Sequence, residues 1–249
     1  MLWNPPMPSL SRPLAVYFAM FLAPVAASAQ DLEEAQIKEL VFEAIRENPE
    51  IILEAMDLLQ AREAEAQASA VQAVLSQERD ILENDPNAFV MGNPKGDVTI
   101  VEFMDYNCPY CRQAQPQVAR LLEENSDVRL VLREWPILSD GSVFAARAAL
   151  AAREQDRYAE MHEALMGLQQ PADETSVMAV AEELGLDLEQ LRSAMEDPAI
   201  DEHLETSARL VEALGFQGTP SFVVGEFLVP GFIPYEELAE RVADVRGEE

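Results

Sequence analysis

The sequence predicts an α/β domain with an inserted helical region, preceded by a helical arm. Three observations predict this class: an apolar, β-branched run at residues 98–104 that leads into a helix, a long helical stretch at residues 137–215, and a strand pair at residues 221–231 with a helix after it. With 249 residues and 49% hydrophobic content, the chain can bury a full-sized core. This composition excludes a disordered, collagen-like or multi-span membrane protein.

Residues 1–29 have the pattern of a secretory signal peptide. Arg12 precedes an apolar run at residues 14–25, and a small-residue pattern that suits signal peptidase ends at Ala29. A retained membrane anchor is the alternative, but the run is shorter than the roughly 20 residues that a helix needs to cross a bilayer. We therefore expect cleavage near Ala29 and a mature protein that is periplasmic or otherwise exported.

The chain is strongly acidic. Its 17 basic and 46 acidic residues give a formal net charge of −29, and removing residues 1–29, which hold one arginine and no acid, makes this 16 − 46 = −30. A phosphate backbone would be repelled, so nucleic-acid binding is excluded as a function. Two cysteines do not make a four-ligand structural zinc site, and no metal site or cofactor is expected.

Residues 30–85 form a helical arm with a composition of its own. Apolar residues recur at three- and four-residue spacing, a break is expected at Asn48-Pro49, and residues 61–73 are rich in Ala, Glu and Gln. Two interpretations stay open: the arm packs on its own domain, or it joins copies of the chain into a homo-oligomer. We favour self-association through residues 31–60, because apolar residues become sparse after Leu59.

The main domain is expected at residues 86–249, and it begins with a loop and a strand. Residues 86–97 are turn-rich and lack the spacing of a phosphate-binding loop, so a nucleotide site is not supported. The β-branched and apolar run at residues 98–104 is short enough for a buried strand. It leads directly into a dithiol motif.

The dithiol motif Cys108-Pro109-Tyr110-Cys111 stands at the start of a helix that reaches about residue 124. Unpaired N–H groups and the positive dipole end of a helix stabilise a thiolate, so Cys108 is the expected nucleophile. Pro109 is tolerated in the first turn, where its missing N–H costs nothing. Cys111, one turn further in, is placed to attack a mixed disulfide and release the substrate.

Glu102 is an acid inside an otherwise apolar strand, six residues before Cys108. It is either a solvent-facing strand residue or a buried carboxylate that relays a proton to or from Cys111. We favour the proton relay, because the strand is apolar on both faces and a buried acid is rare unless it is used.

The rest of the domain surrounds the dithiol. A second strand is expected at residues 128–135, and the helical insertion at residues 137–215 is followed by Thr219-Pro220, a hairpin and a closing helix at residues 234–245. His162 and His203 have no nearby cysteine or second histidine. Both are expected at the surface or at helix caps, without a role.

Taken together, these elements resemble the thioredoxin fold with the helical insertion of the DsbA family, and the N-terminal arm resembles that of ScsC-like members. The resemblance implies that Cys108 attacks, that Cys111 resolves and that Glu102 matches the buried acid of the family. It also implies that Thr219-Pro220 is a cis bond that faces the dithiol and binds substrate backbone. The implied partners are protein substrates with thiols or disulfides and a membrane redox partner.

Two positions differ from the pattern of the family's oxidases. Tyr110 stands where they carry His, and Thr219 stands where they carry Val; both differences resemble disulfide isomerases and reductases. With Pro109, Tyr110 tunes the redox couple: it lends no positive charge to the thiolate, so the couple should be less oxidising.

The sequence therefore predicts an exported thiol:disulfide oxidoreductase that acts on protein substrates, as an oxidase or an isomerase. The alternative is a chaperone-like binding module whose helical arm holds unfolded chains, with a secondary role for the dithiol.

Overall fold

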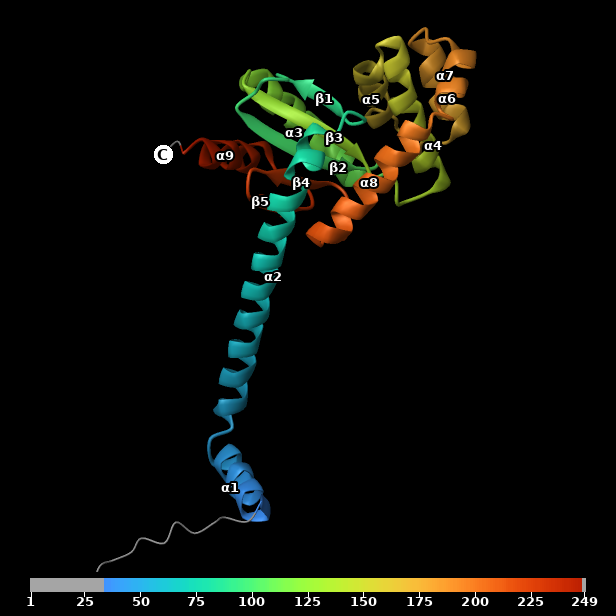
Figure 1. The fold of residues 1–249 in the computed structure, drawn as a ribbon. Helices are drawn as coiled ribbons and strands as arrows, with labels where there is room; N and C mark the ends of the chain where they lie inside the picture. Colours follow the sequence, from blue (N-terminus) through green and yellow to red (C-terminus); the bar gives the residue numbers. More distant parts are fainter. Residues whose placement is uncertain (1–33, 248–249) are drawn as a thin grey trace, which may run out of the picture. The chain divides into compact units, whose positions relative to one another are not determined.

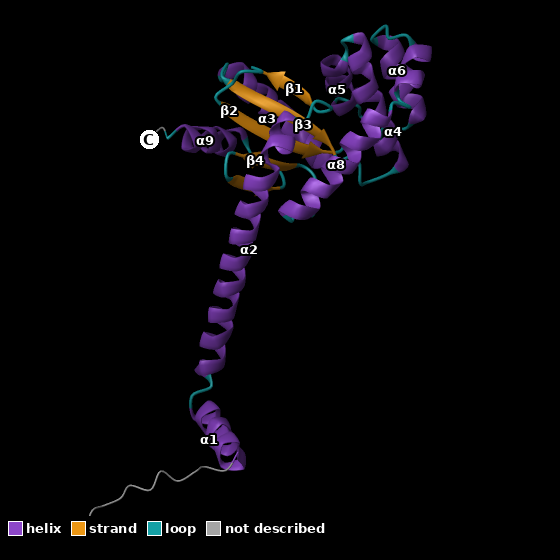
Figure 2. Cartoon of the chain, in the orientation of Figure 1, coloured by secondary structure: helices purple, strands orange, loops and turns teal. Residues whose placement is uncertain are grey.

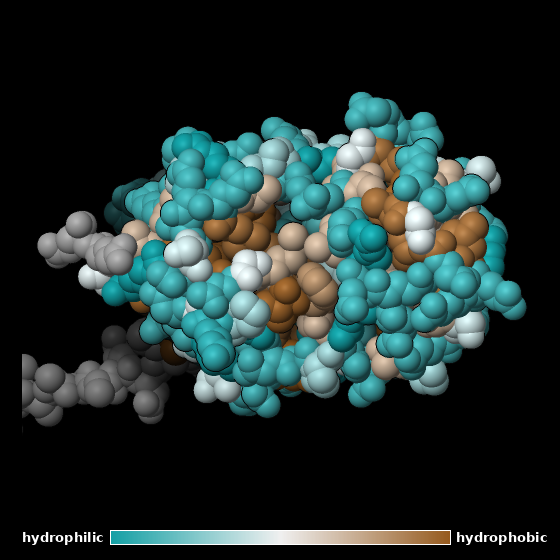
Figure 3. Space-filling view, turned by 90° about the horizontal axis from the view of Figure 1, so that it is seen from above, coloured by the Kyte–Doolittle hydropathy of each residue, from teal (hydrophilic) through white to brown (hydrophobic). Residues whose placement is uncertain are grey.

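The computed structural model describes residues 34–247, so the expected signal peptide lies outside the described residues. The chain divides into two units, one that ends at Leu58 and one that begins at Leu59. Among the helices of residues 34–247, none combines the length and the apolarity that crossing a membrane requires. Most of the face drawn in Figure 3 is hydrophilic, with separate apolar areas, as the excess of acidic residues predicts.

The first unit consists of α1 (Glu34–Glu47) and the beginning of α2 (Glu50–Asn84). The expected break at Asn48-Pro49 separates the two helices, and the Asn48 side chain donates to the Ala44 carbonyl at 3.2 Å. No residue of α1 is buried. Apart from the half-buried Ile45, the large apolar side chains of this unit are at least about two fifths exposed: Ile37, Leu40, Val41, Phe42, Ile51, Ile52, Leu53, Met56 and Leu58.

The second unit is built on a five-stranded mixed sheet with the strand order β1-β3-β2-β4-β5. The strands are β1 (Phe89–Gly92), β2 (Val98–Met104), β3 (Val128–Glu134), β4 (Ser221–Val224) and β5 (Phe227–Pro230). Only β2 and β3 run parallel, and α3 (Pro109–Glu124) makes the crossover between them (Figure 1). The thioredoxin fold predicted from the sequence is confirmed.

Strand β1 corrects the sequence analysis, which expected only a turn-rich loop at residues 86–97. Phe89 pairs with Leu132 of β3, in an antiparallel register that continues to Gly92. The strand is four residues long, and the proline, asparagine and glycine residues around it dominate the local pattern. Pairing with a neighbour that lies about 40 residues later in the chain makes it a strand.

Alternate residues of β2 face opposite sides of the sheet. Ile100 and Met104 pack in the core that contains α3 and α9 (Tyr235–Arg246). Val101 and Phe103 pack in a second core with α8 (Pro198–Leu214) and the C-terminal half of α2. Because successive side chains of a strand alternate, Glu102 lies on the face that α3 covers.

The helical insertion occupies the chain between β3 and β4, as expected for residues 137–215 (Figure 2). Several of its helices begin at a polar cap, which satisfies free N–H groups of the first turn: Ser139, Asp173, Asp187 and Asp197 each accept a hydrogen bond from a backbone N–H. Its elements are α4 (Asp140–Ala151), η1 (Ala152–Gln155), α5 (Tyr158–Met166), α6 (Glu174–Glu183), α7 (Leu188–Ala194) and α8.

The C-terminal half of α2 belongs to the second unit and packs on its sheet. Leu75 and Leu82 are buried in the core of Val101 and Phe103. Arg79 pairs with Glu226 in the β4–β5 turn. Of the two interpretations of the arm, packing on its own domain therefore holds for this half.

Both histidines are buried, which corrects the expectation that they lie at the surface or at caps. His162, on α5, stacks on the Tyr158 ring and lies 3.2 Å through Nδ1 from the Tyr106 hydroxyl. His203, on α8, is fully buried and its Nε2 lies 2.7 Å from Glu134 Oε2. Neither sequence neighbourhood reveals this, because the partners of both rings come from distant parts of the chain.

A buried charge network joins α2, β3, α8 and α5. Arg133 donates to Asp85 Oδ2 at 2.7 and 3.0 Å, and Tyr158 donates to the Glu134 carboxylate that also pairs with His203. Burial opposes the charge of His203, but the carboxylates of Asp85 and Glu134 raise its pKa. The two acids therefore favour the charged form of His203, and Arg133 pairs with Asp85 in the same network.

Candidate active site

The dithiol stands at the N-terminus of α3, as the sequence predicts. Cys108 is the N-cap residue with extended backbone angles, φ −77° and ψ 118°, and Pro109 is the first helical residue. The Cys108 N–H donates to the Asp105 carbonyl at 3.0 Å, which turns the chain from β2 into the helix. Cys111 lies one turn further in and is fully buried. Both cysteines are free thiols in this structure.

The loop before β4 brings Thr219 and Pro220 to the dithiol. α8 ends at Gly215, whose left-handed conformation, φ 76°, lets the chain turn into this loop. The Thr219–Pro220 peptide bond is cis, as the family resemblance implied. The Cys108 thiol donates to the Thr219 carbonyl at 3.0 Å. Residues 111 positions apart in the chain thus meet at one sulfur.

Cys108 has a lowered pKa. A hydrogen bond from Cys111 makes the largest contribution to the lowering, and the Thr219 side chain and the N–H groups of Cys111 and Tyr110 add to it. Together they outweigh burial, which alone would raise the pKa, and lower the pKa of Cys108 to about 6. The N–H groups belong to the first turn of α3, where they have no partner within the helix. Cys108 is therefore largely a thiolate at neutral pH.

Cys111 has the opposite electrostatics. Burial raises its pKa strongly, and a hydrogen bond to Cys108 and the charge of Glu102 add to the increase. The inner sulfur is thus protonated and shielded while the outer sulfur is ionised. The two thiols differ in the direction that the sequence analysis predicted for an attacking and a resolving cysteine.

Glu102 is 4% exposed and lies on the face of β2 that α3 covers. Burial raises the pKa of its carboxyl to about 8, with a further contribution from the charge of Cys108. Of the two expectations for this residue, the solvent-facing one is wrong. The charge of its carboxylate contributes to the raised pKa of Cys111.

Tyr110 and Pro109 lie on the outer side of the dithiol. Tyr110 is 61% exposed, and its backbone N–H, not its side chain, lowers the pKa of Cys108. A side chain with this exposure beside the reactive sulfur can contact a docked polypeptide.

Asp105 is a site residue that the sequence analysis missed. It is 1% exposed, and Oδ1 accepts from the Asn107 N–H at 2.7 Å. Its Oδ2 accepts from the N–H groups of Ile137 and Leu138 at 2.9 and 3.0 Å. The Asp-x-Asn pattern before a helix was the available signal, because Asp bonds the backbone two residues on. Asp105 holds the dithiol loop against the entry to the helical insertion.

Asn107 and Arg112 fasten the same loop to the far end of the insertion. Asn107 exchanges hydrogen bonds with the Ala172 backbone, 2.6 Å from its N–H and 3.0 Å from its carbonyl. Arg112 donates to the Leu168 and Gln170 carbonyls at 2.8 and 3.2 Å. The insertion therefore positions the helix that carries the dithiol.

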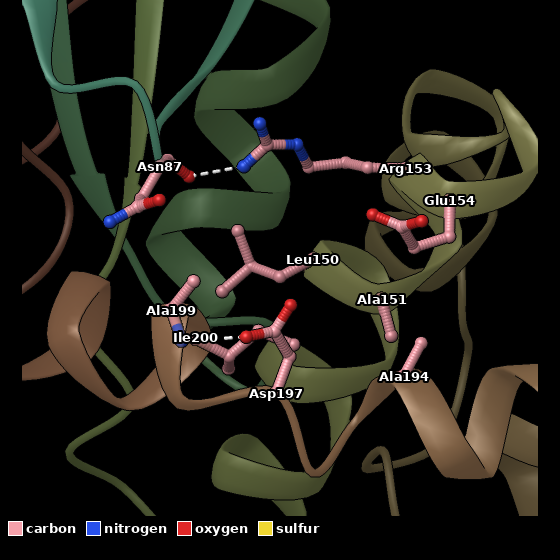
Figure 4. A pocket seen from close by; sticks show the side chains of 9 residues that line it. All are labelled: Asn87, Leu150, Ala151, Arg153, Glu154, Ala194, Asp197, Ala199 and Ile200. Atoms are coloured by element: carbon pink, nitrogen blue, oxygen red, sulfur yellow. Dashed lines mark hydrogen bonds between the residues drawn. The ribbon is translucent and has the colours of Figure 1, made fainter.

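A separate pocket of about 190 Å³ lies between the segment before β1 and the helices of the insertion (Figure 4). Arg153 bridges it by donating to the Asn87 carbonyl at 2.5 Å, and Asp197 at its floor accepts from the Ala199 N–H at 2.9 Å. None of the predicted site residues lines this pocket. Within residues 34–247, no group of three or more His, Cys, Asp or Glu side chains is arranged to hold a metal.

Two family models match the chain. The model of the DSBA-like thioredoxin domain matches residues 99–243, which is more than half of the chain and includes both cysteines. The model of the copper resistance protein ScsC N-terminal domain matches residues 33–66, which cover α1 and the first part of α2.

Solved structures that resemble this chain include a thioredoxin-like oxidoreductase and a ScsC protein. A thioredoxin-like oxidoreductase from Silicibacter pomeroyi DSS-3 is 56% identical, with a TM-score of 0.67, and the match covers 69% of this chain and 99% of that one. A linker-deletion mutant of Proteus mirabilis ScsC is 27% identical with a TM-score of 0.67, over 88% of this chain and 99% of that one.

A curated relative is much longer than this chain. The Na(+)/H(+) antiporter NhaA 3 of Salinispora tropica is 35% identical over 137 residues, which are 54% of this chain and 21% of the antiporter. The chain thus matches about a fifth of the length of that relative.

Proposed function

We propose that this chain, which belongs to the family of DSBA-like thioredoxin domains, is a thiol:disulfide oxidoreductase that exchanges disulfides with protein substrates. One observation carries the proposal: Cys108 begins α3 with a lowered pKa and touches the Thr219 carbonyl, while Cys111 lies buried behind it. Disulfide exchange through a mixed disulfide needs such a pair of one reactive and one protected thiol.

The exchange proceeds through two attacks at sulfur. The Cys108 thiolate attacks a substrate disulfide, forms a mixed disulfide and releases the other substrate sulfur as a thiolate. Formation of the mixed disulfide removes the charge of Cys108, which lowers the pKa of Glu102 from its value in the reduced protein and increases the fraction that is ionised. The ionised Glu102 takes the proton of Cys111, and the Cys111 thiolate attacks Cys108 Sγ. The Cys108–Cys111 bond forms, the intermolecular bond breaks, and the second substrate sulfur leaves with the electron pair. Substrate oxidation runs through the same steps in reverse.

The proposed place of action is the periplasm or another exported compartment, after removal of residues 1–29. The support is the sequence pattern of that segment, because a reactive dithiol suits a compartment where disulfides form and persist. There, a membrane redox partner would return the dithiol to its working state after each turnover.

We favour isomerisation over simple oxidation as the reaction of the intact protein. Tyr110 adds no positive charge to the Cys108 thiolate, which makes a strongly oxidising couple less favourable. The exposed apolar side chains of the first unit support self-association through residues 31–60. Several dithiols on one assembly would let a substrate be attacked, released and attacked again.

Turnover of a scrambled disulfide protein tests the proposal. The wild-type chain should restore the native pairing of the scrambled substrate and reduce insulin in the presence of a thiol donor. Cys108→Ala should abolish both activities, whereas Cys111→Ala should accumulate mixed disulfides with substrate. A Cys108→Ala variant as active as the wild type would refute the proposal.

The exposed apolar residues of the first unit also support a second function, in which the arm holds unfolded chains. Suppression of the aggregation of a reduced, unfolded protein measures this activity. If Cys108→Ala suppresses aggregation as well as the wild type does, while the deletion of residues 31–60 removes the suppression, the holding function exists beside the dithiol chemistry. Loss of suppression in Cys108→Ala would refute it.

A further inference from the structure

The proton that Cys111 gives up must leave a buried site. Glu102, its proposed acceptor, is only 4% exposed. A cavity of about 30 Å³ adjoins this carboxyl between β2, α3 and α5. A water molecule needs roughly 10–15 Å³ of such space, so the cavity has room for water. The residues that define its polar lining are Glu102, Gln115, His162 and Glu163.

A groove that is open to solvent lies beside the dithiol and shares part of its lining with the cavity. Gln115, Glu163 and Met166 line both the cavity and the groove. The groove measures about 550 Å³ and is bordered by Pro109 and Arg112 on α3. A proton that leaves the carboxyl toward the groove therefore has to pass these three side chains.

His162 lines the cavity as a neutral ring, and the tautomer in which Nδ1 accepts from Tyr106 is the one that offers a donor to water. Burial lowers its pKa to about 4, so the imidazole is uncharged at neutral pH. Tyr106 stays protonated because burial raises its pKa well above the usual value, and its hydroxyl and His162 Nδ1 share a hydrogen bond of 3.2 Å. A neutral ring that accepts at Nδ1 carries its proton on Nε2, which leaves that N–H as its donor.

We propose that water in this cavity connects Glu102 to the groove, and that His162 is a positioning residue whose Nε2–H holds this water on the carboxylate. This inference rests on the proposed function. During resolution the proton of Cys111 passes to Glu102, then to the water, and leaves through the groove. The electron pair left on Cys111 forms the Cys108–Cys111 bond, and the released sulfur takes a proton from solvent.

The aromatic disulfide 5,5′-dithiobis(2-nitrobenzoate) separates the two chemical steps in a stopped-flow experiment on the reduced, full-length mature chain. The first coloured thiolate is released when Cys108 attacks, and the second when Cys111 resolves the mixed disulfide. His162→Phe removes the donor, and His162→Gln keeps an N–H donor on a chain of similar reach. Ala119→Leu fills the cavity without changing a titratable group, because Ala119 is part of its lining. Ala164→Leu adds the same side chain on α5 outside the lining.

We expect His162→Phe and Ala119→Leu to slow the second release about tenfold at pH 7. This is less than the roughly 100-fold or more that a positioned proton acceptor contributes to a rate, because Glu102 itself stays in place. The first release should stay within about twofold of wild type, and His162→Gln and Ala164→Leu should behave like wild type in both steps. The slowed variants should also show a larger solvent isotope effect on the second step.

Three results would overturn the inference. The first is an unchanged rate of the second release in both His162→Phe and Ala119→Leu. The second is an equal slowing of both releases in these variants. The third is a His162→Gln variant that is as slow as His162→Phe. In each case a wild type that still releases both thiolates leaves the proposed function standing. A wild type that releases neither would instead refute the proposed function, and this inference with it.

Discussion

The substitution Thr219→Val tests how the loop before β4 lowers the pKa of Cys108. Val has nearly the shape of Thr but lacks the hydroxyl that stabilises the thiolate. The backbone carbonyl that accepts from the Cys108 thiol is unaffected, so the packing around the sulfur is kept. The expected result is a higher pKa for Cys108 in an otherwise intact site.

The size of the shift follows from the strength of one hydrogen bond. A hydrogen bond to a charged group contributes about 1.5–3 kcal/mol, and solvent at the edge of the site replaces part of it. A net loss of about 1.4 kcal/mol is about one pKa unit. The pKa of Cys108 should therefore rise from about 6 to about 7.

The pH dependence of alkylation turns this shift into rates. At pH 5 the thiolate fraction of Cys108 falls from about 9% to about 1%, a change of about ninefold for a one-unit shift. The more basic thiolate is about threefold more nucleophilic. The variant should thus react about threefold more slowly at pH 5 and about threefold faster at pH 9.

Stopped-flow alkylation by iodoacetamide between pH 4 and 9 measures both rates, and mass spectrometry confirms that Cys108 is the residue modified. Ser221→Ala is the matched control, because the Ser221 hydroxyl lies two residues after Thr219, at the start of β4, and donates to the Gly218 carbonyl at 2.7 Å. The rate profiles of wild type and Thr219→Val should cross, and that of Ser221→Ala should not move. Parallel profiles with the same midpoint would show that the Thr219 hydroxyl does not stabilise the thiolate.

The remaining predictions concern stability and assembly. Glu102→Gln should raise the free energy of unfolding of the reduced protein by about 3 kcal/mol at pH 7. The reason is that the folded-state pKa of about 8 lies above the usual 4.5, so Glu102 destabilises the fold increasingly as pH rises between these values. Urea unfolding that shows no gain over wild type at pH 7 contradicts this. Arg133→Met should destabilise the chain by about 3–5 kcal/mol by leaving Asp85 buried without its partner, and Asp85→Leu in the same chain should recover most of the loss; a double variant no more stable than the single one argues against it. Deleting residues 31–60 should yield a monomer that keeps dithiol oxidation or reduction but loses disulfide shuffling, and light scattering that finds the intact mature chain monomeric would end the assembly proposal.

Elements with a strong local pattern could be predicted from the sequence. The apolar run at residues 98–104, the helix start at Pro109 and the helix break at Asn48-Pro49 depend on neighbours within a few positions. The period of two in β2 also supported a buried Glu102, since residues on both of its faces are apolar.

Elements that depend on distant partners were missed or left open. Phe89 and its neighbours become a strand because β3 offers an edge, and His162 and His203 are buried because Tyr106 and Glu134 supply their hydrogen bonds. The place of the arm also depends on distant partners, so the sequence left two interpretations of it open. Only the packing of Leu75 and Leu82 on the sheet shows that the C-terminal half of α2 is part of the second unit.

The sequence by itself determined the chemistry of this protein, because the order strand, Cys108, Pro109 and helix creates a thiolate site through the backbone N–H groups of one helical turn. Only the tertiary structure decided how far the pKa values of Cys108 and Glu102 are shifted. The Thr219 carbonyl accepts from Cys108 across 111 residues, and the Thr219 side chain lowers the pKa of that thiol. The pKa of Glu102 depends on how deeply α3 and α5 cover it. Burial and charge act through space, so a pKa depends on neighbours that only folding brings together.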